Sequence, residues 1–154
     1  MTKPYFVVKY GPEGIKTKKE VSPLETLVIL KPGWEKNDFL LYGIANRLIS
    51  KNKLEILLKR EFLPDRKFWE SFYLKDAGTG YFEEMIQYLL SSKSNFFILK
   101  GGDNIIELAR GRVTYERAKR RRKSSDIENF VHTSDSKESA EREIKLVREF
   151  LSKE

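Results

Sequence analysis

The sequence predicts an α+β fold: a ferredoxin-like βαββαβ domain whose antiparallel sheet carries helices on one face. Two observations predict it. Short apolar runs rich in β-branched residues alternate with longer segments in which apolar residues recur at helical spacing. The chain has 154 residues and is 40% hydrophobic, which suits one domain with one core. We expect that domain at residues 24–154, after an N-terminal extension at residues 1–23.

The extension has the pattern of a short strand or hairpin. An apolar run, Tyr5–Tyr10, is followed by the turn residues GPEG and a polar stretch that ends at Pro23. The main domain begins at Leu24. Its first apolar and β-branched run, Thr26–Leu30, stops at Pro32–Gly33, which is typical of a buried central strand that ends in a loop.

A helix is expected next, because Leu40, Ile44 and Leu48 lie at helical spacing behind Asn37 or Asp38 as the N-cap. The later elements, each bounded by turn residues, are a strand at Leu54–Leu63, helices within 64–76 and 80–92, a strand at Asn95–Gly102, a helix from Asp103, a short strand at 128–132 and a closing helix from Ser134. In this order the elements reduce to the βαββαβ pattern.

The closing helix has its own start signal and an apolar face. Asp135 is followed three residues later by Glu138, which is the spacing of a capping box. The helix then places these apolar residues on one side: Ala140, Ile144, Val147 and Leu151. A single apolar face indicates a helix that packs on the sheet.

Composition excludes several classes of site. The chain has no cysteine, so it forms neither disulfides nor thiolate metal sites. No apolar run approaches the ~18–20 residues of a membrane span, and the run near the first residue is too short for a signal peptide. We therefore expect a soluble, cytoplasmic protein without a membrane partner.

The formal net charge is +7, and much of the excess lies in one segment. Residues 112–123 hold seven basic residues and one acidic residue, Glu116. Such a charge run is either a solvated surface or a binding site for phosphate groups of nucleotides, nucleic acids or lipids. The sequence leaves both interpretations open, and nucleic acid is a candidate partner.

His132 is the only histidine of the chain, at the end of the expected strand 128–132. A histidine in that position is more often a structural ring than a catalyst. Two features favour catalysis: the neighbours Thr133 and Ser134 are small and polar, and Glu143 can fold back to accept a hydrogen bond from one ring nitrogen. A carboxylate in that role fixes the tautomer and leaves the other nitrogen free as a nucleophile.

The stretch NFVHTSDSKESAEREI, residues 129–144, resembles the active-site signature of nucleoside diphosphate kinases, N-x-x-H-x-S-D-S-x-x-S-A-x-x-E-I. Three other stretches, ETLVILKPG, FYLKDAGTGYFEEMIQYLLSS and GGDNIIELAR, are similar to segments of the same family. The resemblance runs from Leu24 to Phe150. It implies that a neutral imidazole takes the γ-phosphate of a nucleoside triphosphate and passes it to a diphosphate, with Mg²⁺ bound through the nucleotide phosphates.

The resemblance also implies a role for each matched residue. His132 is the expected nucleophile, and Ser134 and Glu143 are expected to support its ring. The expected nucleotide contacts are Lys31 and Arg110 to phosphate, Tyr73 in the active site, Tyr81 stacked on the base and Asn129 to the ribose.

Each nucleotide contact has an alternative interpretation. Without the resemblance, Tyr73 and Tyr81 at helical spacing would be interpreted as core or interface residues. Lys31, before a proline, would be a solvated strand end. Arg110 and Arg112 are both candidates for one phosphate contact, and the spacing from the preceding segment favours Arg110.

The chain departs from the family in three places. The family loop before the signature supplies a phosphate-binding threonine and a second arginine and joins subunits, and it is shorter here. Arg121 is the expected second arginine, with Arg120 and Arg122 as alternatives. Gly33 stands where the family commonly has aspartate, and Thr133 replaces a smaller residue.

The sequence therefore predicts a divergent nucleoside diphosphate kinase that acts on nucleoside tri- and diphosphates. The alternative is a non-catalytic protein on the same fold that binds nucleotides or nucleic acid through residues 112–123. Because the shortened loop carries several like charges, we expect a homo-oligomer with a dimer as its basic unit and with larger rings weaker or absent.

Overall fold

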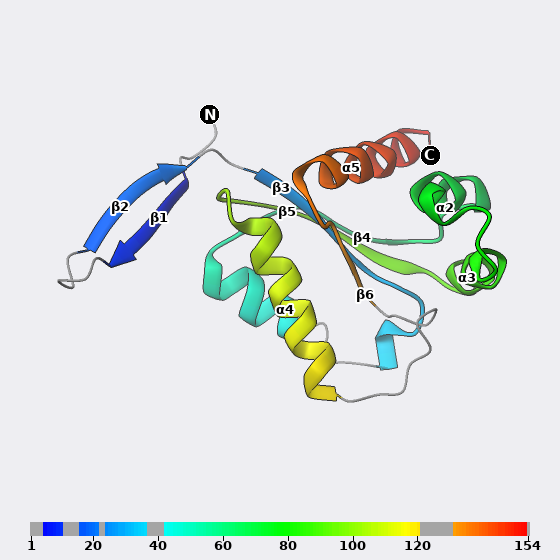
Figure 1. Ribbon diagram of the computed structural model, residues 1–154, viewed down its shortest axis with the longest axis horizontal. Coiled ribbons are helices and arrows are strands. Elements are labelled where there is room, and N and C mark those ends of the chain that lie inside the picture. Colours follow the sequence, from blue (N-terminus) through cyan, green and yellow to red (C-terminus); the bar gives the residue numbers. More distant parts are fainter. Residues whose placement is uncertain (1–4, 11–15, 22–23, 37–41, 121–130, 154) are drawn as a thin grey trace.

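Figure 1 shows the chain as a computed structural model, with a small hairpin at one end and a larger sheet with its helices at the other. The structure describes residues 5–10, 16–21, 24–36, 42–120 and 131–153. Within these ranges, no helix is long and apolar enough to cross a membrane.

The first two strands, β1 (Tyr5–Tyr10) and β2 (Lys16–Val21), form a sheet of their own. They pair antiparallel with Tyr5 opposite Val21, which confirms the predicted hairpin. In Figure 1 the hairpin projects from the end of the molecule where the larger sheet begins. A two-stranded hairpin is marginally stable in water by itself, so most of the folding energy comes from the larger sheet.

The larger sheet has four antiparallel strands in the order β4-β5-β3-β6, which confirms the predicted ferredoxin-like pattern. Their bounds are Leu24–Leu30 for β3, Glu55–Phe62 for β4, Ser94–Gly101 for β5 and Val131–Thr133 for β6. The central strands β3 and β5 are buried along most of their length, because both carry apolar residues on both faces. β4 and β6 are the edges, and most of β4 is exposed.

Helical segments connect the strands. In chain order they are η1 (Trp34–Lys36), η2 (Gly43–Ser50), α2 (Arg66–Phe72), η3 (Leu74–Asp76), α3 (Phe82–Leu89), α4 (Ile105–Arg120) and α5 (Lys137–Ser152). The helix predicted after β3 is η2, which has π-type hydrogen bonds and buries Ile44 and Leu48. Its expected N-caps, Asn37 and Asp38, lie outside the described residues.

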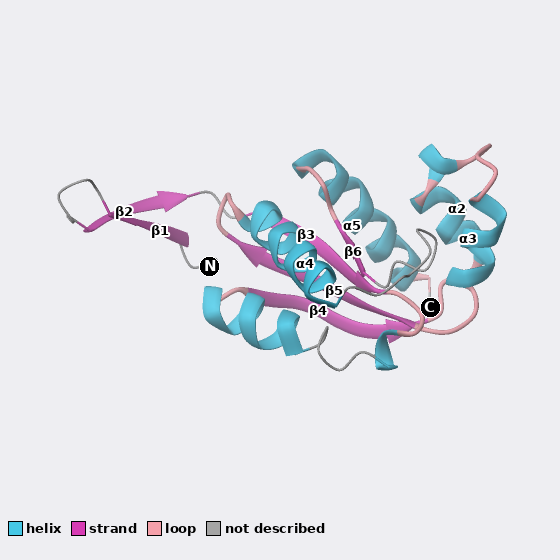
Figure 2. Cartoon of the chain, turned by 60° about the horizontal axis from the view of Figure 1, so that its bottom comes forward, coloured by secondary structure: helices cyan, strands magenta, loops and turns pink. Residues whose placement is uncertain are grey.

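Helices cover both faces of the sheet, and the prediction of a single helical layer is wrong. On one face, the ring of Phe96 in β5 packs against Phe68 of α2, which in turn contacts α5. On the other face, a side chain at Gly101 of β5 would meet Ile105 of α4, and α4 packs on η2. In Figure 2 the strands lie between α5 and η2. Two layers are needed because β3 and β5 are apolar on both sides.

The closing helix α5 begins one residue later than its predicted cap. Ser136, rather than Asp135, is the N-cap, because its extended backbone lets its hydroxyl accept a hydrogen bond from the N–H of Ser139 at 3.0 Å. A hydrogen bond from Ser139 also lowers the pKa of the Asp135 carboxyl. The predicted apolar face is confirmed, with these residues packed in or against the core: Ala140, Ile144, Val147 and Leu151.

Candidate active site

His132 lies in the middle of the short edge strand β6, directly opposite Ile29 of β3. Residues that pair across an antiparallel ladder share a face of the sheet, and so do residues two apart along one strand. Lys31 follows Ile29 by two residues, just beyond the end of β3. The sheet therefore brings the predicted nucleophile and the predicted phosphate-binding lysine to the same face.

Ser134 continues the pairing with β3 beyond the end of β6. Its N–H donates to the carbonyl of Leu27 at 3.2 Å, and its hydroxyl accepts from the N–H of Leu27 at 3.3 Å. The same hydroxyl donates to Oε1 of Glu143 at 2.8 Å. Glu143 comes from α5 and is only 4% exposed. The serine therefore ties the carboxylate of α5 to the backbone of β3.

Nε2 of His132 lies 2.9 Å from the same carboxylate oxygen of Glu143. An ionised carboxylate only accepts hydrogen bonds, so Nε2 carries the ring proton and Nδ1 keeps its lone pair. Among the described residues, the ring has no second hydrogen-bond partner. The structure thus brings His132, Ser134 and Glu143 together in the geometry that leaves one ring nitrogen free to react.

Two aromatic rings from the end of α2 border the histidine. The ring of Phe72 lies 4.9 Å from that of His132 at 75°, and the ring of Tyr73 lies 6.0 Å away at 86°. Edge-to-face packing of this kind favours one orientation of the imidazole plane. Nζ of Lys31 lies 5.4 Å from the centre of the Tyr73 ring, within cation–π distance. Lys31, Tyr73 and His132 therefore meet in one place.

The turn after Lys31 explains why glycine occupies position 33. Gly33 has a φ of 95°, a left-handed conformation that strains any residue with a Cβ. Beside it, the carbonyl of Pro32 accepts a hydrogen bond from the hydroxyl of Tyr88 in α3 at 2.6 Å. The backbone of this turn therefore selects glycine, and α3 holds the turn that follows the lysine.

Arg110 of α4 reaches the loop that follows β6. Its Nη1 donates to the carbonyl of Asp135 at 3.5 Å, the outer limit of a hydrogen bond. Arg112, the alternative phosphate contact, instead lines a groove with Arg47 and Lys51 between η2 and α4. The geometry therefore favours Arg110 as the arginine on the side of His132.

Tyr81 lies at the exposed start of α3, with 43% of its surface accessible. Its hydroxyl donates to Asp76 of η3, and this bond raises the pKa of Tyr81. A two-pronged ion pair between Arg66 of α2 and Glu83 of α3 braces the same segment. Tyr81 is thus held by surface contacts, separate from the hydrogen bonds around His132.

Residues 25–150 match the family described as nucleoside diphosphate kinase. The chain belongs to the nucleoside diphosphate kinase family. It is 33% identical over 129 residues to the nucleoside diphosphate kinase of Methanocaldococcus jannaschii, across 79% of this chain and 90% of that protein. It is 31% identical over 134 residues to that of Thermococcus kodakarensis, across 79% and 74%. The crystal structure of the Aquifex aeolicus nucleoside diphosphate kinase has a similar fold, with a TM-score of 0.68 at 24% identity over 82% of this chain and 95% of that one.

Part of the expected site of this kinase lies outside the described residues. Asn129 and Arg121 fall there, together with Arg122. Arg120 ends α4, but its side chain is likewise not described. The ribose contact and the second arginine therefore stay predictions.

Two residues that contact the candidate site or the helix end beside it were not predicted from the sequence. Phe72 borders the ring of His132, yet in the sequence it is one of several aromatic residues in a helical segment. Arg142 contacts backbone carbonyls at the end of α2 that are 70 and 71 positions away. The one signal for Arg142 was its place beside Glu143 within the signature.

Proposed function

We propose that this nucleoside diphosphate kinase carries the phosphoryl group on His132. The observation that carries the proposal is the 2.9 Å contact between Nε2 of His132 and Oε1 of Glu143, because it leaves the lone pair of Nδ1 available for attack. Ser134 holds the carboxylate in turn, through its own bond to the same oxygen. His132 is the only histidine in the chain, so no other histidine can replace it.

The transfer takes place in two half-reactions. In the first, the lone pair of Nδ1 forms a bond to the γ-phosphorus while the bond from that phosphorus to the β–γ bridging oxygen breaks, and the nucleoside diphosphate leaves with the electron pair. In the second, a terminal oxygen of another diphosphate attacks the same phosphorus and the P–N bond breaks, which returns the electron pair to Nδ1. Glu143 holds the proton on Nε2 through both steps.

We propose the following contacts to the nucleotide: Lys31, Arg110 and Arg121 to phosphate oxygens, Tyr73 beside the transferred group, Tyr81 stacked on the base and Asn129 to the ribose. Lys31 and Tyr73 are supported by their position next to His132. Arg110 is supported by its reach to the loop that follows His132. A cation beside the reacting phosphate offsets the negative charge that opposes attack.

We propose that Mg²⁺ arrives bound to the phosphate oxygens of the nucleotide. Lys31 and Arg110 are cationic side chains on the side of His132. Their charge suits phosphate oxygens rather than a metal ion. The carboxylate of Glu143 is already engaged by the ring and by Ser134. When bound, the metal neutralises charge between the β- and γ-phosphates.

Labelling with γ-³²P-ATP tests the phosphohistidine. The protein is expected to retain label that is stable in alkali and lost in acid, and to release it as nucleoside triphosphate when any nucleoside diphosphate is added. Adding EDTA before ATP is expected to slow the labelling. A protein that transfers phosphate without retaining alkali-stable label would rule out the proposed intermediate.

We propose a dimer as the basic unit. β4 is an edge strand of the sheet, and its Ile56 and Leu57 are exposed. An exposed apolar edge can pair with another chain. Sedimentation at low micromolar concentration is expected to give twice the 18.1 kDa of one chain. A stable hexamer under those conditions would contradict the proposal.

We further propose residues 24–154 as the kinase domain and 1–23 as an appended extension, with the whole chain acting in the cytoplasm. The family match over residues 25–150 supports this boundary. The same match favours the enzyme over the non-catalytic binding protein. Nucleic-acid binding through residues 112–123 stays a prediction.

A further inference from the structure

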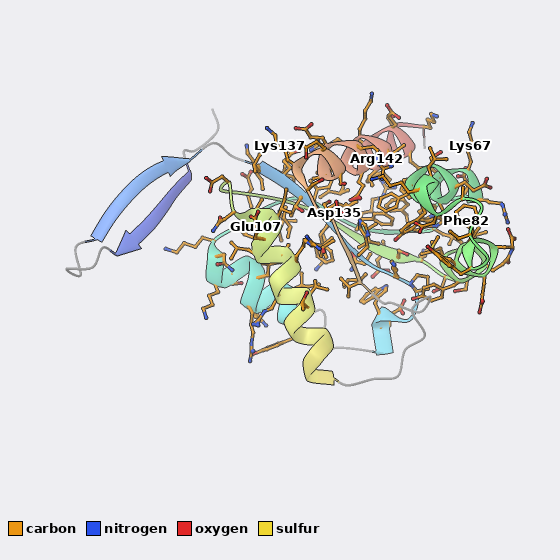
Figure 3. All side chains as sticks on the ribbon, in the orientation of Figure 1. Lys67, Phe82, Glu107, Asp135, Lys137 and Arg142 are labelled. Atoms are coloured by element: carbon orange, nitrogen blue, oxygen red, sulfur yellow. The ribbon has the colours of Figure 1, made fainter. Side chains whose placement is uncertain are left out.

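Arg142 connects the helix that carries Glu143 to the end of α2. Its Nη2 donates to the carbonyl of Phe72 at 3.2 Å, and its Nη1 lies 3.4 Å from the carbonyl of Ser71. In Figure 3 the labelled Arg142 lies between α5 and α2. Ser71 and Phe72 are the last two residues of α2.

The C-terminal end of a helix is electrostatically favourable for the guanidinium of Arg142. The last carbonyls of a helix have no partner within it, and they carry the negative end of the helix dipole. Arg142 therefore satisfies carbonyls of α2 and holds the backbone of Phe72 in place. The ring of Phe72 is the one that lies 4.9 Å from the imidazole of His132.

The same guanidinium also approaches the catalytic carboxylate. Nη2 of Arg142 lies 4.0 Å from Oε2 of Glu143, while the other oxygen, Oε1, accepts from Ser134 and His132. Nη2 of Arg142 thus lies near two groups that contact His132 or carry a contact to it. One is the carboxylate of Glu143, and the other is the backbone carbonyl of Phe72, whose ring borders the imidazole. Oε1 of Glu143 thus faces His132 and Ser134, and Oε2 faces Arg142.

We propose that Arg142 is a positioning residue for phosphoryl transfer, acting through Glu143 and Phe72 to keep His132 in its reactive tautomer and orientation. The proposal rests on the proposed function of His132. Because Arg142 is 45% exposed, its ion pair with Glu143 is partly screened and contributes little to folding stability. The effect of Arg142 is therefore expected in the rate of transfer, where small displacements of a reacting group are costly.

Arg148 provides a matched control on the same helix. Its side chain is 52% exposed. Its two terminal nitrogens donate to the two carboxylate oxygens of Glu25 in β3, at 3.2 and 3.3 Å. It makes no contact with His132, Glu143 or Ser134 among the described residues. Arg148→Gln removes an arginine of similar exposure that also links α5 to another element, but one remote from the nucleophile.

Steady-state kinetics separate positioning from binding. Arg142→Gln is expected to lower kcat on the order of tenfold, with the nucleotide KM changed by less than about twofold, because the geometry of attack is disturbed and the nucleotide contacts are kept. Arg142→Lys, which keeps the charge but not the planar fork, is expected to recover part of the loss. Arg148→Gln is expected to match the wild type. A raised KM with unchanged kcat, or an equal loss in Arg148→Gln, would overturn the proposal.

The tautomer of His132 gives a readout that does not depend on activity. Since the chain has one histidine, ¹⁵N NMR of labelled protein yields a single imidazole to interpret. At alkaline pH the wild type is expected to show the proton on Nε2, and Arg142→Gln to show an increased share of the other tautomer. Equal tautomer populations in the two proteins would overturn the proposed route through Glu143. Failure of the wild type to form a phosphoenzyme would instead overturn the proposed function and leave this comparison of tautomers valid.

Discussion

The two sides of the site are built in different ways. Around His132, side chains from β6, α5 and the loop between them are joined by hydrogen bonds of 2.8 and 2.9 Å, and these bonds are anchored to the backbone of β3. On the side proposed to bind the nucleotide, the segment from Tyr73 to Tyr81 consists of turns and the short helix η3, and exposed contacts such as the ion pair of Arg66 and Glu83 brace it. The proposed chemistry thus lies on the sheet, and the proposed recognition of the base lies on an exposed segment.

The difference has an energetic consequence. A buried carboxylate such as that of Glu143 is tolerated because it is hydrogen-bonded, and loss of a partner leaves a costly unsatisfied group. Exposed ion pairs are screened by water and contribute little. We call the group of His132, Ser134 and Glu143 the sheet side. Substitutions on the sheet side should therefore have large effects on rate or stability, and those on the exposed segment smaller ones.

The largest effect is expected for His132→Ala. With no other histidine in the chain, this variant is expected to form no phosphoenzyme and to lose several orders of magnitude in turnover. Labelling with γ-³²P-ATP measures the first quantity, and coupled kinetics the second. Labelling at the wild-type level in a variant with an unchanged melting temperature would place the nucleophile elsewhere.

Glu143→Gln should have the next largest effect. Glutamine keeps an acceptor for Nε2 of His132 but lacks the charge that favours the correct tautomer, so a loss of about 10–100-fold in kcat is expected. Phosphoenzyme should still form, at a lower rate, in rapid-quench experiments. Complete loss of labelling would mean that the carboxylate does more than orient the ring.

The sheet side was also the more predictable from the sequence. The spacing between His132 and Glu143 within a strand–loop–helix segment was enough to predict their hydrogen bond, because β6 and α5 are adjacent in sequence. The ferredoxin-like pattern followed from the alternation of the elements. The start of α5 was misjudged by one residue, because Asp135 and Ser136 are both good caps and only backbone conformation separates them.

Other features depend on contacts between distant parts of the chain and could not be predicted from local sequence patterns. The second helical layer follows from the burial of β3 and β5 on both faces, which is a property of the assembled sheet. The contact of Arg142 with Phe72 joins two residues that are 70 positions apart in the sequence. For this reason, the position of Phe72 beside His132 was found only in the structure.

Tyr81→Ala tests the exposed segment. If Tyr81 stacks on the base, the variant should weaken all nucleotides together by about 1–3 kcal/mol, because every base offers a π-face. Tyr81→Phe is the matched control: it keeps the ring and removes only the hydrogen bond to Asp76, so its affinities should stay near those of the wild type. Titration with several nucleotides measures both. Loss of affinity for a single base would indicate edge recognition in place of stacking.

Ser134→Ala tests how much the buried hydrogen bonds of the sheet side contribute to folding stability. Removal of the hydroxyl leaves the N–H of Leu27 without the acceptor that Ser134 provides, and leaves Oε1 of Glu143 with His132 but without its second donor, so the free energy of unfolding should fall by about 1–3 kcal/mol. Denaturant unfolding measures this quantity. Ser152→Ala, at the exposed last residue of α5, is the control and should change the free energy of unfolding little. Equal stability of the two variants would contradict the assigned difference between buried and exposed hydrogen bonds.

The smallest effect is expected for Glu83→Gln. Hydrogen bonds from Arg66, and then Gln87, lower the pKa of Glu83 from 4.5 to about 2. A carboxyl group with a depressed pKa adds stability at neutral pH, and this contribution is lost as the pH falls from about 4.5 through about 2. Because the pair is exposed to solvent, the variant should melt only slightly below the wild type near pH 7, and the two should converge near pH 2. Glu70→Gln is the control, since it removes a partner of Arg66 within α2 and keeps the link to α3. A loss as large as that of Ser134→Ala would show that the exposed segment is held as firmly as the sheet side, and the contrast between them would fail.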